Sequence, residues 1–191
     1  MHLRQMTHAS RSLRVGFLVA FAMFHVMPTH AACSLSFSNV DVDYGRLTRA
    51  ALTGPRLAPA IVSLDIRQVT VNVVCDEPGA MRVRLFGAGT GGQFQFGAGG
   101  QTEMRFENAQ LDGRPVMLGR AIGGGVPKAV GPRVTVGPNQ ELVPVEQGLP
   151  ASGKRFAVQA VLNTTLTDKA TRVTQPTTLK ANIEFQAYAV F

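Results

Sequence analysis

The chain has 191 residues, of which 45% are hydrophobic and 16% charged, and its 19 lysines and arginines against 12 acidic residues give a net charge of +7. The basic residues are spread among apolar positions and form no dense run with aromatic platforms, so a nucleic-acid-binding surface is not expected. The length suits a single domain with a buried core.

The first 31 residues have the pattern of a secretory signal. They begin with basic residues and no acidic one, continue with an apolar run from Phe17 to Met27, and end in small residues near Ala31. This run is too short to span a bilayer. We therefore expect a signal peptide over residues 1–31 and one domain over residues 32–191. A lipoprotein anchor is the alternative reading, but His30 stands where a branched apolar residue is needed.

Without the signal, 160 residues remain, with 16 basic and 12 acidic side chains and hence a charge of +4. All four histidines lie in the signal, at positions 2, 8, 25 and 30. The exported chain therefore lacks the commonest general base near neutral pH and the commonest zinc ligand. We expect no enzymatic activity, no metal and no cofactor.

Two cysteines, Cys33 and Cys75, remain after the signal. An even count in an exported chain predicts a disulfide, and closing a loop of about 40 residues would stabilise the fold by roughly 4 kcal/mol. The alternative is a pair of free buried thiols.

Two-residue alternation of apolar and polar side chains recurs along the chain, and no helical periodicity of useful length follows the signal. It predicts strands over residues 40–44, 69–75, 81–85, 156–166 and 177–191, each with one buried side. Turn signals fall at residues 54–55, 76–80, 111–115 and 149–154, and a long surface loop is expected over residues 119–137. Short strands without intervening helices indicate an all-β sandwich.

Several short motifs are weaker signals. "GAGTGG" at residues 87–92 fits a dinucleotide fingerprint, but a strand-like segment follows it where a helix is required, which favours a hairpin. Asp41 and Asp43 would share one strand face and could flank a glycosidic bond, but an ordinary solvated face is the favoured reading. Asp76 with Glu77 is read as part of a turn and Asn163 as a chance glycosylation sequon.

The last fifteen residues, "TTLKANIEFQAYAVF", alternate throughout. Their apolar side is formed by Leu179, Ala181, Ile183, Phe185, Ala187, Ala189 and Phe191. This is the pattern of a half-buried strand.

Taken in order, these features resemble the subunits of chaperone–usher fimbriae, the pilin family that includes type 1 fimbrial proteins. The similarity consists of a signal peptide, a cysteine at the head of the exported chain, a second cysteine in "VTVNVVCD", then "FQFGAGG", "LDGRPVML", "SGKRFAVQAVL" and a terminal alternating strand. The individual motifs are loose, but their order and spacing cover nearly the whole exported chain.

The resemblance implies an immunoglobulin-like sandwich that lacks its final strand and leaves an apolar groove. A periplasmic chaperone would first lend a strand to this groove, and the N-terminal extension of a neighbouring subunit would replace it. The groove and chaperone-binding residues would be Leu179, Ala181, Ile183, Phe185, Ala187, Ala189 and Phe191, with the Phe191 carboxylate held by basic residues of the chaperone. The other implied partners are an outer-membrane usher and a host-surface receptor, with the fimbrium displayed on the bacterial surface after export through the periplasm.

One departure from the family concerns the donor extension. A cut after Ala31 leaves only Ala32 before the first cysteine, so the chain is expected to accept a strand without donating one, as a tip or minor subunit would. Three alternatives remain open at this point: a complete sandwich, a periplasmic pilin-like sandwich that never polymerises, and a secreted carbohydrate-active enzyme using Asp41 and Asp43.

Overall fold

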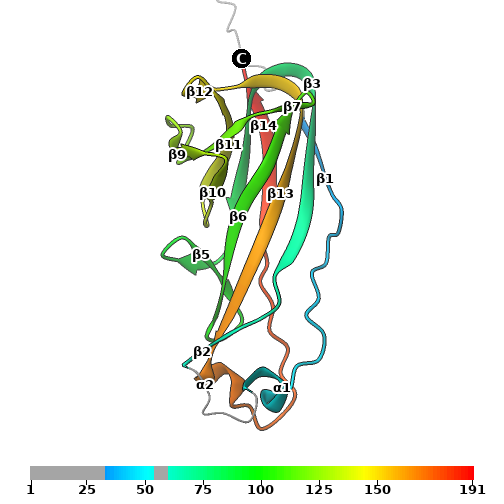
Figure 1. The fold of residues 1–191 in the computed structure, drawn as a ribbon, viewed down its shortest axis with the longest axis vertical. Coiled ribbons are helices and arrows are strands. Elements are labelled where there is room, and N and C mark those ends of the chain that lie inside the picture. Colours follow the sequence, from blue (N-terminus) through cyan, green and yellow to red (C-terminus); the bar gives the residue numbers. More distant parts are fainter. Residues whose placement is uncertain (1–32, 54–59) are drawn as a thin grey trace, which may run out of the picture.

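The computed structural model describes residues 33–53 and 60–191, so the predicted signal peptide and the predicted turn at Gly54 and Pro55 lie outside it. Within these residues the chain forms an elongated, curled sheet of fourteen antiparallel strands with two short helices at one end (Figure 1). The strands are β1 (Cys33–Phe37), β2 (Ile61–Ser63), β3 (Arg67–Phe86), β4 (Gly89–Thr90), β5 (Gln93–Phe96), β6 (Gly100–Leu111), β7 (Arg114–Pro115), β8 (Met117–Ala121), β9 (Lys128–Gly131), β10 (Arg133–Thr135), β11 (Gln140–Glu146), β12 (Leu149–Pro150), β13 (Ser152–Thr167) and β14 (Glu184–Val190); the helices are α1 (Arg49–Thr53) and α2 (Asp168–Thr171). The predicted all-β sandwich fold is confirmed.

The long strand β3 belongs to both layers of the curled sheet. Its first half pairs with β13 and β1, and its second half pairs with β11 and β14. Val74 is paired with Arg155 and Gly79 with Gly153, so four residues of β3 stand opposite Lys154 alone. Such a bulge bends a strand and lets it pass from one layer to the other. The turn predicted at residues 76–80 is therefore a bend inside β3, visible at the top of Figure 1.

The core lies between the layers and is lined by the alternating side chains of the long strands. Its fully buried residues include Phe94, Phe106 and Phe156, which come from β5, β6 and β13. The apolar sides predicted for residues 69–75 and 81–85 both face this core, because β3 keeps its alternation through the bend. Neither helix in the described part of the chain is long or apolar enough to cross a membrane.

The predicted disulfide between Cys33 and Cys75 is present. The two cysteines face each other in the register of β1 on β3. The bond thus fastens the edge strand β1 to β3 close to the bend.

Two predicted turns are confirmed as hairpins. Gly91 and Gly92 have positive φ angles and connect β4 to β5, so "GAGTGG" is a strand connection and not the start of a helix. Asp112 and Gly113 have positive φ angles and connect β6 to β7. Paired positive φ angles give the turn whose twist suits a two-residue hairpin.

Four other predictions of local structure are wrong in whole or in part. The last strand begins at Glu184, so residues 177–183 of its predicted span lie outside it. Residues 119–137 contain β9, β10 and the end of β8 in place of a long loop, and residues 149–154 contain β12 and the start of β13. Residues 40–44 do not form a strand. The Asp43 side chain there accepts a hydrogen bond from the Gly45 backbone N–H, and Tyr44 reaches Thr164 through its hydroxyl at 2.8 Å. A local bond such as that of Asp43 competes with strand pairing, and the bond to Thr164 anchors the segment on β13.

Candidate functional site

The strands that pair with β3 are divided between its two sides. Ala80 is paired with Ser152 of β13 and with Val190 of β14, so β13 and β14 lie on opposite sides of β3. Over its first half β3 lies between β13 and β1. β1 and β14 therefore follow one another along the same side of β3, one in each layer, and do not pair with each other.

The bend of β3 brings these two strands face to face at one edge of the sandwich. Phe37 of β1 is paired with Val71, and Phe185 of β14 with Leu85, at comparable distances from the bend. The rings of Phe37 and Phe185 meet edge to face with their centroids 5.1 Å apart. This contact joins the two sides of what we call the open edge, where β1 and β14 lie next to each other without pairing.

The open edge exposes part of the core. A set of apolar side chains along it packs against the core but stays partly exposed: Leu35, Phe37, Ile183, Phe185 and Ala187. In the described residues β14 pairs with β3 alone, so its other edge has no hydrogen-bonded strand. Unpaired backbone groups beside an apolar strip are the features that β-strand addition uses.

The predicted groove residues are placed at different points along this edge. Ile183, Phe185 and Ala187 lie along the apolar strip, and Ala181 is half-buried just before it. Leu179 lies outside β14 and contacts Gly97, in the turn between β5 and β6.

The other end of β14 is packed against the bend of β3. Ala189 is fully buried in the core, whereas Phe191 is 65% exposed. A Cβ atom placed on Gly79 would come within about 3 Å of the Ala189 and Phe191 side chains and of the Val190 carbonyl. The close seating of the end of β14 therefore favours a glycine at position 79, because a side chain there would press on these neighbours.

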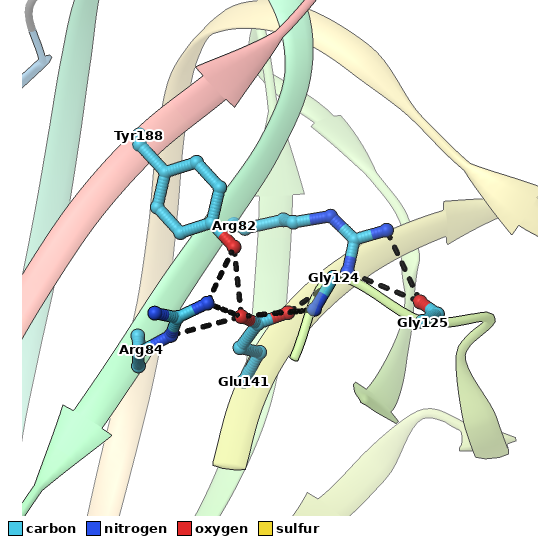
Figure 2. Close-up of polar contacts among 6 residues, drawn as sticks. All are labelled: Arg82, Arg84, Gly124, Gly125, Glu141 and Tyr188. Atoms are coloured by element: carbon cyan, nitrogen blue, oxygen red, sulfur yellow. Dashed lines mark hydrogen bonds and ion pairs between the residues drawn. The ribbon is translucent and has the colours of Figure 1, made fainter. Parts of the chain in front are cut away.

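A second cluster of side chains lies on the outer face of the same layer (Figure 2). It is centred on Glu141 of β11, whose side chain is fully buried. Its carboxylate accepts hydrogen bonds from Arg82 Nη1 at 2.9 Å, from Arg84 Nε at 2.9 Å and from Arg84 Nη2. The Tyr188 hydroxyl on β14 donates to the same carboxylate at 2.7 Å and accepts from Arg84 Nη2 at 3.3 Å.

The cluster also holds the segment that follows β8. The Gly124 backbone N–H donates to both oxygens of Glu141, at 3.1 and 3.3 Å. Both terminal nitrogens of Arg82 donate to the Gly125 carbonyl, at 3.1 and 3.2 Å. We call residues 122–126 the glycine loop; the cluster joins this loop to the edge strand β14 through Glu141 and Tyr188 (Figure 2).

The charge state of the cluster follows from these contacts. Burial alone would raise the pKa of Glu141, but hydrogen bonds from Arg84, Tyr188, Arg82 and the Gly124 N–H outweigh it and hold that pKa below its ordinary value. The pKa of Tyr188 is raised by burial and by the neighbouring carboxylate. Glu141 is therefore ionised and Tyr188 protonated at neutral pH.

Alternation did not reveal this cluster. It predicts that Arg82 and Arg84 face solvent, yet Arg82 is only 7% exposed and pairs with the buried Glu141. The available signal was one acidic residue next to an apolar run, "ELVPV" at residues 141–145, together with two arginines at strand spacing. A lone carboxylate in an interior segment needs a cationic partner.

The remaining candidate residues form no second site. Asp41 and Asp43 are both exposed, and Asp43 is engaged with the Gly45 backbone. Within residues 33–53 and 60–191, no three carboxylate, thiol or imidazole side chains come together as a metal site requires.

The chain was also compared with known proteins. No protein-family model matches it, and no curated protein matches it. Its function is therefore inferred from the open edge and the Glu141 cluster themselves.

Proposed function

We propose that this protein is a structural or adhesive subunit of a chaperone–usher fimbria, and that a strand from another protein completes it at the open edge. A periplasmic chaperone would supply this strand first and a neighbouring subunit afterwards, during export through the usher to the cell surface. The observation that carries the proposal is the apolar strip between β1 and β14, which stays partly exposed beside the free edge of β14.

The energetics favour a partner at this edge. Fully covering a large apolar side chain stabilises it by roughly 1.5–3 kcal/mol, so covering four half-buried ones, Leu35, Phe37, Ile183 and Phe185, would contribute several kcal/mol. This total is comparable to the stability of a whole domain. An added strand would also pair with the free backbone groups of β14. The isolated subunit should accordingly be marginal and prone to edge pairing.

The proposal is tested by co-expression with candidate periplasmic chaperones. We expect aggregation or degradation of the chain alone, and a soluble complex in one-to-one ratio with the matching chaperone. A soluble monomer that melts cooperatively, and that no chaperone binds, would contradict the proposal and favour a self-contained periplasmic sandwich.

A matched pair of variants locates the binding edge. Ile183→Asp places a charge on the apolar strip, whereas Asn182→Asp places the same charge one residue earlier on an exposed side chain. Chaperone capture should be lost in the first variant and retained in the second. Equal capture of both variants would place the chaperone elsewhere on the molecule.

A further inference from the structure

The Glu141 cluster connects two parts of the molecule that are distant in sequence. Tyr188 belongs to β14, a wall of the open edge, and Gly124 and Gly125 belong to the glycine loop. Glu141 lies between them and bonds to both. The cluster thus spans β14, β3 and β11 and ends on the loop after β8 (Figure 2).

The cluster sits on the side of β14 that faces away from the core. Ala187 and Ala189 point toward the core, so Tyr188 between them points outward. A strand added at the open edge would contact the inward side chains and the free backbone edge, and would leave Tyr188 in place. The cluster can therefore act on β14 with the open edge either empty or filled.

We propose that Glu141 and Tyr188 are positioning residues, which hold β14 in register as a wall of the open edge and couple its mobility to that of the glycine loop. The contribution of this coupling to strand uptake rests on the proposed function, whereas the coupling itself rests only on the contacts of the cluster. A partner that pulls the glycine loop away would loosen β14, and ordering the loop would stiffen it.

The hydrogen bonds of the cluster explain how a movement of the glycine loop would reach β14. In the part of the chain that the structure describes, every buried side-chain nitrogen and oxygen atom has a hydrogen-bond partner. Displacing the loop would remove the Gly124 N–H from Glu141 and the Gly125 carbonyl from Arg82. Because the carboxylate is fully buried, its remaining partners, including Tyr188, would have to rearrange around it.

Hydrogen–deuterium exchange measures this coupling from both ends. Tyr188→Phe removes the hydroxyl at the β14 end, and Arg82→Lys keeps the charge but removes the forked donor at the loop end. Tyr44→Phe is the matched control, because it deletes the chain's other tyrosine hydroxyl, which bonds to Thr164. The measurement uses the chain alone or, if only the complex is soluble, the chaperone complex.

We expect each test variant to accelerate exchange about tenfold in both residues 184–190 and residues 122–126. The control should leave both segments unchanged. Faster exchange only in the segment that carries or directly contacts the substitution would overturn the coupling. Uniformly faster exchange in every strand would also overturn it, because the cluster would then be a general stabiliser. Failure of chaperone capture, by contrast, would remove the proposed function and leave this result standing.

A fluorine label gives a second readout if Arg82→Lys does not fold. The chain has no tryptophan and two tyrosines, so Tyr44→Phe leaves Tyr188 as the single site for 3-fluorotyrosine. The charged groups facing Glu141 are Arg82 and Arg84, with Tyr188 as the titratable neighbour. Acidification that protonates Glu141 should shift the Tyr188 resonance and accelerate exchange of the glycine loop over the same pH range. A resonance that shifts without any change in the loop would contradict the coupling.

Discussion

The two long edges of the sandwich are built differently. On one edge the chain passes directly from one layer to the other. β9 pairs with β8, whereas β10, which begins two residues after β9 ends, pairs with β6. Val134 and Val136 fill that edge and are buried. On the other edge β1 and β14 each pair with β3 but not with one another, and the aromatic contact between Phe37 and Phe185 joins them.

The core is covered at the first edge, whereas apolar side chains remain partly exposed at the second. At the β9–β10 corner Val134 and Val136 cover the core, although the outer edge of β9 is also unpaired in the described residues. The open edge has the same kind of core beside it, yet its apolar side chains remain partly exposed.

The largest effect is expected from the disulfide, which fastens the open edge. Replacing Cys33 and Cys75 together by serine should lower the free energy of unfolding by about 4 kcal/mol, from the loss of a loop constraint of some 40 residues. Urea unfolding with and without reductant measures this effect. An unchanged midpoint would show that β1 is held by its other contacts.

Glu141→Gln should cost about 3 kcal/mol, because two arginines lose their shared counter-charge inside the cluster. The pKa of Glu141 in the folded protein lies below its ordinary value of 4.5. Its contribution to stability is therefore fully present above about pH 4.5 and is lost as the pH falls through the lower, folded value. Unfolding free energies measured between pH 7 and pH 3 should fall more steeply for the wild type than for Glu141→Gln. Parallel curves would contradict this assignment.

A pair of identical substitutions compares the two edges directly. Leu118→Ala in β8 removes a fully buried side chain and should cost about 3 kcal/mol with or without a partner. Leu35→Ala in β1 removes a half-buried side chain, so it should cost about half as much in the isolated chain.

Under the proposed function, partner binding should narrow this difference by raising the cost of Leu35→Ala alone. We expect the cost of Leu35→Ala to approach that of Leu118→Ala in the chaperone complex, measured by thermal unfolding of both forms. A cost that is the same free and bound would indicate that no strand covers Leu35.

The smallest effect is expected at the two exposed aspartates. Replacing Asp41 and Asp43 by asparagine should change stability by no more than about 0.5 kcal/mol and leave chaperone capture intact. Loss of a glycoside hydrolase activity in this double variant would support the carbohydrate-active alternative instead.

Much of this fold follows from alternation and cysteine count. The β-sandwich class, the Cys33–Cys75 disulfide and the hairpins at residues 87–92 and 111–115 could be predicted, because each depends on a local pattern or on simple pairing. The apolar side of the last strand was also evident in sequence, and Ile183, Phe185 and Ala187 do pack against the core.

The errors come from contacts between distant segments. Residues 40–44 alternate like a strand, but side-chain bonds to the backbone and to Thr164 hold them in another conformation. The bend inside β3 depends on a bulge against β13, eighty residues further along the chain, and no local pattern specifies such a pairing. The Glu141 cluster needs three strands and a loop to meet, so it could not be found from one strand at a time.

The measurement that tests the open edge most directly is hydrogen exchange of the β14 backbone, free and in the chaperone complex. Alternate amides of residues 184–190 point away from β3 and should exchange rapidly in the free chain, then become protected when a partner strand binds. Amides of β9 and β10 should not change. Protection of all β14 amides in the free chain, with no further change on binding, would show that this edge is already complete.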